Sequence, residues 1–365
     1  MRADLARVGE TQPPRRHVRR WFAAAALLVV VATGLRLYWG LRSHMMLFDT
    51  DTIMLADISN QTGEPVFDDA LNTTLRLGLE QTPYLNVLAG DKVRGTLRLL
   101  KLSATNVTPE IARQVCLKTN SKIVIASSIE DAGNGFDIEL NAIDCQSGTA
   151  IARVRKGVTS RNAVVRGLGA AAAELRGKLG EPAGSIARFN KPLEEATSPS
   201  LEALQSLVKG YTRHLAGDAR GARPSYQRAT ELDPQFALAY AALEAANSNL
   251  GEVAPATIAL TKAFELRDRL SEPSRFRVEG LYYDSVTGEQ EKAYAVLSQW
   301  VQAFPRDVVA HNNFARCLKL LGQLDRAAAE AREAARLLPK SLELQHVDHP
   351  EHVGGPLERS KGLSR

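Results

Sequence analysis

Residues 308–339, VVAHNNFARCLKLLGQLDRAAAEAREAARLLP, contain the pattern that decides the fold of the C-terminal part of this chain. Two stretches of helical composition meet at a glycine, and a proline follows the second stretch. The glycine recurs at spacings of 34, 37 and 34 residues, at Gly217, Gly251, Gly288 and Gly322. An alanine follows each glycine by five residues, at Ala222, Ala256, Ala293 and Ala327. Because glycine permits a tight turn and alanine lets two helices approach closely, residues 201–340 are predicted to form about four stacked helical hairpins.

Prolines mark the ends of the repeats. Each proline follows its glycine by 17 residues and stops the second helix, at Pro234, Pro305 and Pro339. The second repeat has Asp268 at this position, and an insertion of three residues around Ser271–Pro273 explains the spacing of 37. The array is therefore expected to be less regular in its second and third hairpins.

These residues resemble the tetratricopeptide repeat. In the fourth hairpin the resemblance rests on Phe314, Ala315, Leu318, Gly322, Ala327, Ala331, Ala334 and Pro339. In the first hairpin it rests on Gly210, Gly217, Ala222, Tyr226, Ala229 and Pro234. The second hairpin departs from the family pattern at Glu244 and Asp268, and the third has Trp300 where a small alanine is usual. The resemblance implies an α-solenoid that binds other proteins.

In tetratricopeptide arrays the first helix of each hairpin lines a groove, so the resemblance implies where a partner would bind. The inward positions that suit an extended or helical peptide are Tyr211, Asn249, Tyr282, Asn312 and Arg316. Basic residues at Arg275, Arg316 and Lys319 would favour an acidic ligand. The alternative interpretation is that the inward residues only pack one hairpin on the next.

Residues 50–180 alternate strand-like and helix-like patterns, which indicates a small mixed α/β domain. Strands are expected at 52–57, 84–88, 122–128, 136–144 and 150–158, and helices at 67–80, 91–100, 108–119 and 161–179. Residues 59–63 are expected to form a polar loop after the first strand. Residues 181–200 contain three prolines and are expected to link this domain to the repeats.

The N-terminus combines a basic segment with an apolar one. Six arginines against two acidic residues give residues 1–20 a charge of +4, out of +5 for the whole chain, so the basic character is local and does not indicate nucleic-acid binding. Residues 21–41 are nearly all apolar and are predicted to form a transmembrane helix. The positive-inside rule then predicts a single-pass protein of the cell inner membrane, with residues 1–20 in the cytoplasm and 43–365 in the periplasm. A cleaved signal peptide and a buried core helix are the alternatives.

Three cysteines are present, and none of them forms a CxxC motif. Cys116 and Cys145 fall in the same predicted domain and could form a disulfide in an oxidising compartment. The alternative is that these two and Cys317 are separate small apolar residues.

The order of basic segment, span, α/β domain and repeats resembles the C-terminal half of a group of bacterial membrane-bound serine/threonine kinases. The segments that carry the likeness are Asp51–Asp69, Pro192–Ala203, Ala263–Glu272, Tyr282–Glu289 and Pro305–Asn313. The resemblance implies that the α/β domain is similar to the N-terminal domain of TolB. The kinase domain that this family carries is missing here, because no glycine-rich loop, HRD or DFG motif occurs.

No motif for catalysis, cofactor binding or metal binding stands out, so we expect a protein that is not an enzyme. His346, His349 and His352 are interrupted by Pro350 and are expected to belong to a flexible tail, residues 341–365. The predicted fold is therefore α/β plus all-α, with one transmembrane helix and a tetratricopeptide solenoid. The predicted function is a membrane-anchored scaffold for protein partners, and the alternative is the sensor half of a receptor-like kinase system.

Overall fold

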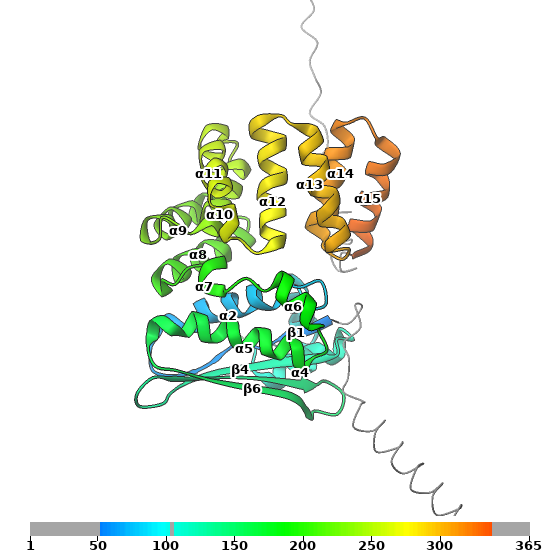
Figure 1. Cartoon of the computed structure of the whole chain (residues 1–365). Coiled ribbons are helices and arrows are strands. Elements are labelled where there is room, and N and C mark those ends of the chain that lie inside the picture. Colours follow the sequence, from blue (N-terminus) through cyan, green and yellow to red (C-terminus); the bar gives the residue numbers. More distant parts are fainter. Residues whose placement is uncertain (1–51, 103–105, 338–365) are drawn as a thin grey trace, which may run out of the picture. The chain divides into compact units, whose positions relative to one another are not determined.

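The computed structural model describes residues 52–102 and 106–337, all of which belong to one compact unit, residues 47–365. An α/β part comes first and a part made only of helices follows it (Figure 1). This arrangement confirms the α/β and helical-repeat parts of the predicted fold.

The α/β part is built on one twisted sheet. Its strands are β1 (Thr52–Leu55), β2 (Ser59–Gln61), β3 (Asn86–Val87), β4 (Ile123–Asp131), β5 (Phe136–Asp144) and β6 (Ala150–Val158). They lie in the order β3-β1-β4-β5-β6, and β2 continues the line of β1 alongside β4. Strands β1, β3 and β4 are parallel, whereas β4, β5 and β6 form an antiparallel meander.

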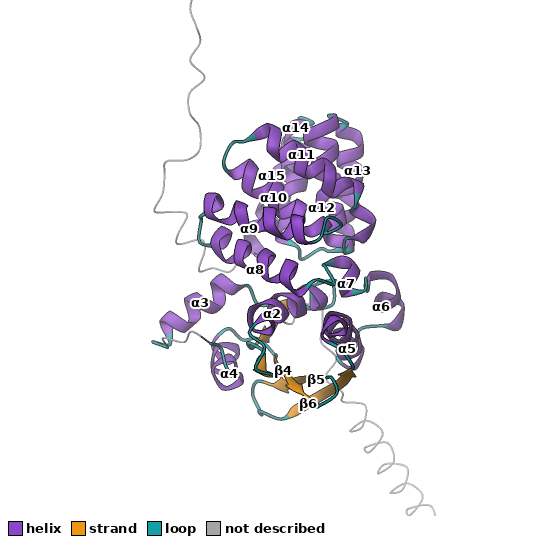
Figure 2. Ribbon diagram, turned by 90° about the vertical axis from the view of Figure 1, so that its left-hand side faces the viewer, coloured by secondary structure: helices purple, strands orange, loops and turns teal. Residues whose placement is uncertain are grey.

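Helices cover both faces of this sheet. They are α2 (Val66–Leu79), α3 (Gly90–Leu99), α4 (Pro109–Lys118) and α5 (Val164–Lys178). Figure 2 shows α2 and α5 side by side over the strands, with α3 and α4 at the left of the view. Alternate residues of β4 explain the two layers, because Ile123 and Ile125 join the core under α2 and α5 while Val124 joins the core of α3 and α4.

Helix α2 shows why this sequence packs as it does. Phe67, Leu71, Leu75 and Leu79 recur every fourth residue and are all fully buried. This spacing places them on one face of a helix, and that face forms the centre of the core. The helix predicted at 67–80 is therefore observed almost unchanged.

Two predictions in this region are wrong. The strand expected at 84–88 is reduced to Asn86–Val87, although the backbone N–H of Leu88 still donates to the Ile53 carbonyl oxygen of β1 at 2.8 Å. The loop expected after the first strand contains β2, since Ser59–Gln61 pairs with β4. The side chain of Asn60 then donates to the Glu64 carbonyl oxygen at 2.8 Å and holds the turn into α2.

Residues 181–200 fold onto the α/β part and differ from the linker expected there. They contain α6 (Ala183–Phe189) and α7 (Leu193–Ala196). Leu193 is buried in the cluster that includes α2 and α5, and Phe189 is buried in the cluster of the third and fourth hairpins. The Lys191 backbone and the Gln81 side chain form two reciprocal hydrogen bonds, of 2.7 and 3.1 Å. Apolar side chains and these bonds explain why the segment is packed.

Eight helices form the four hairpins. They are α8 (Leu201–Leu215), α9 (Ala219–Leu232), α10 (Ala237–Asn249), α11 (Val253–Glu265), α12 (Glu272–Tyr282), α13 (Gln290–Ala303), α14 (Val308–Leu320) and α15 (Leu324–Leu337). Each of the four repeat glycines has a left-handed φ, between 70° and 83°. The third hairpin is irregular, because α12 ends in a π-helical turn, Tyr283–Thr287, before Gly288.

The α/β part and the repeats share a core. Helix α2 packs against α8, and the buried cluster under α2 extends through the first two hairpins. Leu204 and Leu207 of α8 are fully buried in it. A second cluster fills the third and fourth hairpins and includes Phe189 of α6.

No described helix combines the length and apolar character that crossing a membrane requires. The predicted span, residues 21–41, and the histidines of the tail lie outside the described residues.

Candidate functional site

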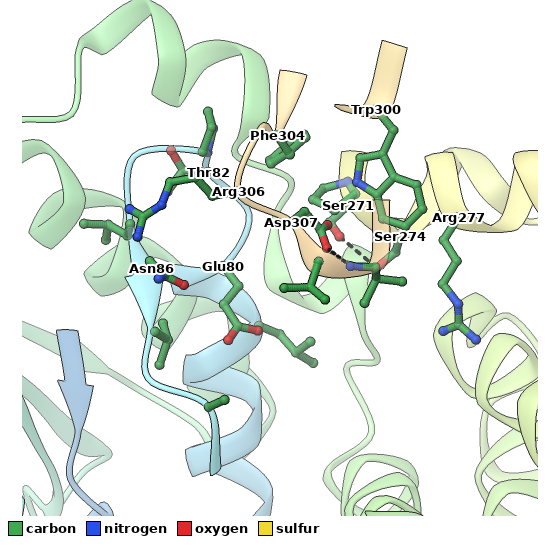
Figure 3. A pocket seen from close by; sticks show the side chains of 18 of the residues that line it. Glu80, Thr82, Asn86, Ser271, Ser274, Arg277, Trp300, Phe304, Arg306 and Asp307 are labelled. Atoms are coloured by element: carbon green, nitrogen blue, oxygen red, sulfur yellow. Dashed lines mark hydrogen bonds between the residues drawn. The ribbon is translucent and has the colours of Figure 1, made fainter. Parts of the chain in front are cut away.

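A cavity of about 710 Å³ lies between the α/β part and the repeats, and Figure 3 shows its lining. One wall is the end of α2 with the chain that leads through β3. The other is formed by the N-terminal ends of α10, α12 and α14 with the end of α13. The polar lining residues include Glu80, Thr82, Asn86, Tyr211, Ser274, Arg277, Arg306 and Asp307. The volume falls in the range of pockets that hold small ligands or short peptide segments.

Two carboxylates lie in this cavity and influence each other. Burial raises the pKa of Asp307, although its side chain caps α14 by accepting hydrogen bonds from the backbone N–H groups of Val309 and Ala310, at 2.9 and 3.3 Å. Burial also raises the pKa of Glu80, and the charge of Asp307 adds to this effect. Arg76, 3.1 Å away, opposes the rise. The raised pKa of each carboxyl means that its surroundings disfavour the negative charge, although Arg277 and Arg306 also line the cavity.

Glu80 is recessed and yet accessible. About 41% of its side-chain surface remains exposed, because it faces the open space of the cavity. The surrounding protein replaces part of the water that would otherwise stabilise its charge, and the exposed part stays in contact with solvent. A ligand that enters the cavity would meet this carboxylate.

Tyr211 connects the carboxylates to the repeats. The pKa of its hydroxyl is raised to about 12, mainly by burial, with a smaller lowering by Arg277 and a still smaller rise from Glu80. Its ring packs edge-on against Tyr226, with centroids 5.8 Å apart. Tyr211 is therefore a neutral hydrogen-bonding group at the wall formed by the first hairpin.

The remaining wall is apolar. Leu85 and Val87 come from the chain around β3, and Leu238 from the start of α10. Trp300 and Phe304 close the side formed by α13. The cavity thus offers charged and apolar contacts side by side, as protein-interaction sites do.

The five partner-binding residues predicted from the sequence do not converge. Among them Tyr211 alone lines the cavity. Asn249 is exposed and lies 2.8 Å from the Nε2 atom of His214, which joins α10 to α8. Tyr282 is partly buried and stacks on Phe264, with ring centroids 3.8 Å apart.

The other two predicted residues lie on α14. Asn312 is exposed. Arg316 forms an ion pair with Asp284, whose side chain is 4% exposed. This pair links the π-helical turn to α14, and the Arg316 side chain remains 43% exposed.

Sequence reasoning missed Glu80, Arg277 and Asp307. Asp307 precedes a helix and could have been recognised as an N-cap, but a cap carries no sign of a cavity. Glu80 follows the last residue of α2, and Arg277 lies in a helix with little amphipathic character. No periodic pattern relates these three positions, so the fold alone brings them together.

The structure joins Cys116 of α4 to Cys145 after β5 in a disulfide, with Cα atoms 6.2 Å apart. Both cysteines are fully buried in the core on the outer face of the sheet. Arg113 donates to the Cys145 carbonyl oxygen at 2.8 Å and adds a second link between α4 and this turn. Cys317 is a buried free thiol.

Within residues 52–102 and 106–337 no group of three potential metal-ligating side chains comes together.

No protein-family model and no curated protein matches this chain. Its structure has distant likenesses to solved ones. MamA has 23% sequence identity over 48% of this chain and 97% of its own, with a TM-score of 0.29. The C-terminal domain of LpoB from Salmonella enterica has 18% identity over 32% of this chain and 92% of its own, with a TM-score of 0.28. The Cut9–Hcn1 complex has 21% identity over 38% of this chain and 26% of the matched chain, with a TM-score of 0.32. At these TM-scores none of the three assigns a function to this chain.

Proposed function

We propose that this protein is a scaffold that binds a segment of a partner protein in the cavity between its α/β part and its repeats. The observation that carries the proposal is the cavity itself, which combines recessed charges with apolar walls and is built by both parts of the chain. Sites at the boundary between two structural parts are common places for ligands to bind. Helical-repeat arrays commonly present such extended binding surfaces.

The charges of the cavity indicate the chemistry of the partner. Glu80 and Asp307 are both held in surroundings that disfavour their negative charge. A basic side chain placed between them would compensate that charge and would be favoured. Leu85, Val87 and Leu238 suit a neighbouring aliphatic side chain. We therefore expect a partner segment with a lysine or arginine next to aliphatic residues.

The proposed scaffold is anchored in the inner membrane by residues 21–41 and displays residues 43–365 in the periplasm. The arginine cluster before the apolar segment supports this orientation. The disulfide between Cys116 and Cys145 supports it as well, because disulfides persist in oxidising compartments. Alkaline phosphatase fused after residue 365 should be active and the same enzyme fused after residue 20 inactive, and the opposite pattern would contradict the proposed topology.

Binding in the cavity can be tested with defined peptides. A photoreactive phenylalanine analogue would replace Asn86, which lines the cavity, in the full-length chain in detergent. The probes are three pentapeptides of sequence Ala-Leu-X-Leu-Ala, capped at both ends, in which X is arginine, glutamine or glutamate. We expect labelling to be strongest for arginine and weakest for glutamate.

Two further variants serve as matched controls. Glu80→Gln should reduce the preference for arginine severalfold, because it removes one recessed charge without changing the shape. Glu139→Gln removes a carboxylate that pairs with Arg153 on the outer face of the sheet, and it should leave the preference unchanged. Equal labelling by all three peptides, or an unchanged preference in Glu80→Gln, would contradict the proposal.

A further inference from the structure

Positive charge is concentrated in the layer that α3 and α4 form on one face of the sheet (Figure 2). Residues 90–122, the segment that contains both helices, have seven lysines and arginines against two acidic residues. Their net charge of +5 equals that of the whole chain. Residues 1–20 add +4, so the rest of the chain is acidic on balance, and the total conceals this second basic region.

Five cations of this layer are exposed, and none of them forms an ion pair within the part of the chain that the structure describes. Arg94, Arg98 and Lys101 follow one another at spacings of four and three residues, which places them on one side of α3 and of the turn that ends it. Lys118 is the last residue of α4, and Lys122 directly precedes β4. The arginines of β6, by contrast, are paired with carboxylates of β4 and β5. The charge of the α3–α4 layer is therefore available to an external anion.

Both helices also expose a leucine beside a cation. Leu99 of α3 is 75% exposed and directly follows Arg98. Leu117 of α4 is 50% exposed and directly precedes Lys118. The inward sides of both helices are buried in the core of the layer, so its packing does not need these two leucines. Exposed leucines next to lysines and arginines are typical of helices that bind the interface of an anionic membrane.

We infer that the outer side of α3 and α4 docks on the anionic phospholipid headgroups of a membrane. The lysines and arginines lie against the lipid phosphates, because an anionic surface attracts basic residues that come close to it. The leucines enter the boundary between headgroups and acyl chains, where an apolar side chain leaves water. A nucleic acid would compensate the cations but leave the leucines in water, so a lipid surface fits the layer better.

The point at which the chain enters the α/β part supports this docking. The backbone N–H of Lys122 donates to the Thr52 carbonyl oxygen at 2.9 Å, so one end of the basic layer lies beside the start of β1. The segment 42–51 connects Thr52 with the apolar residues proposed as the anchor, and ten residues reach at most about 35 Å when fully extended. The layer therefore stays within reach of the bilayer. This step rests on the proposed anchor, and it does not rest on the binding of a partner in the cavity.

Docking can be observed in vesicles with a fluorophore on the layer. In a Cys317→Ala background, which leaves the disulfide intact, Leu99→Cys would carry an environment-sensitive nitrobenzoxadiazole group. The full-length chain is reconstituted into vesicles of phosphatidylcholine alone or of phosphatidylcholine mixed with phosphatidylglycerol. We expect the emission to shift to shorter wavelength only in the mixed vesicles. Added salt should reverse the shift, because it screens the attraction between the cations and the lipid.

Three comparisons separate docking from a general effect of the membrane. The same fluorophore on Leu215→Cys, an exposed position at the end of α8, should show no shift between the two kinds of vesicle. Removing the three cations of α3 together should abolish the shift at position 99, in the combined variant Arg94→Gln, Arg98→Gln, Lys101→Gln. Removing three exposed cations of the repeats should leave that shift unchanged, in the matched variant Lys209→Gln, Arg220→Gln, Arg332→Gln.

Emission that does not differ between the two kinds of vesicle, or a shift that survives the combined variant of α3, would overturn the inference. A shift that soluble polyglutamate produces in neutral vesicles would assign the layer to an acidic protein partner and would overturn it as well. None of these results depends on a peptide in the cavity or on the phosphatase fusions. The proposed partner binding and the proposed topology are therefore tested separately from the docking of this layer.

Discussion

Arg176 and Glu181 form a two-pronged ion pair that is shielded from solvent, with N–O distances of 2.7 and 3.0 Å. Their side chains are 0% and 1% exposed. Arg176 also donates to the carbonyl oxygen of Gly78, and Glu181 accepts from the Ser185 hydroxyl at 2.6 Å. The pair therefore ties α5 to the end of α2 and to α6.

Removing one member of this pair should be costly. Arg176→Met would leave the Glu181 carboxylate buried without a counter-charge, and we expect a loss of about 3–5 kcal/mol in the free energy of unfolding. Arg176→Met combined with Glu181→Leu should lose less than the sum of the two single changes, because no charge is left buried. Urea unfolding of the full-length chain measures all three, and purely additive losses would show that the two side chains are not coupled.

The same pair should make the protein sensitive to acid. Burial alone would raise the pKa of Glu181, but hydrogen bonds from Arg176 and Ser185 hold it below its ordinary value. A depressed pKa in the folded state means that the stabilisation is complete above the unfolded value, about 4.3. It is lost as the pH falls through the folded value. The unfolding free energy should therefore decline below about pH 4.5, and Glu181→Gln should flatten that decline. An unchanged slope in the variant would assign the acid sensitivity to other groups.

The disulfide should contribute strongly to stability. Cys116 and Cys145 are 29 residues apart. A disulfide that closes a loop of that length restricts the unfolded chain and thereby stabilises the folded state by about 3–4 kcal/mol. Replacing both cysteines with serine should lower the unfolding free energy by that order, and reduction of the native chain should act in the same direction. Thiol titration of the denatured, unreduced chain should find one free thiol, and Cys317→Ala should leave none. Three reactive thiols in the unreduced chain would contradict the pairing.

Replacing two helical glycines with alanine should change the free energy of unfolding in opposite directions. A Cβ atom on Gly210 would lie 2.3 Å from the Tyr226 ring, which is fully buried and cannot move aside. Gly210→Ala should therefore cost about 1–3 kcal/mol. A Cβ atom on Gly95 of α3 would meet nothing within 4 Å, so Gly95→Ala should gain about 0.5–1 kcal/mol through helix propensity. Thermal unfolding of both variants checks the signs, and a neutral Gly210→Ala would mean that α8 and α9 are packed less tightly than the structure has them.

Elements with a strong local pattern could be predicted from the sequence. The alternation in 136–144 and the fourth-residue spacing in 67–80 give strands and helices close to those observed. Segments whose conformation depends on distant partners could not. Ser59–Gln61 forms a strand only because it pairs with β4. Residues 181–200 fold only because they hydrogen-bond to Gln81 and pack against α5.

Almost all of the candidate site depends on contacts between segments that are distant in the sequence. The repeat pattern marks the position of Tyr211 on its helix, and this residue lines the cavity. Glu80 and Asp307 are more than two hundred residues apart, and nothing in either local sequence refers to the other. Their proximity follows from the packing of the α/β part against the repeats, which no local pattern determines.

The contact between α2 and α8 also affects the order in which the chain can acquire structure. During synthesis the α/β part leaves the ribosome before any hairpin does, and domains commonly fold as units in that order. Once α2 is in place, α8 meets a finished apolar surface, and every later hairpin meets the one made just before it. The repeats therefore have a template at one end, and the array can grow in a single direction from it.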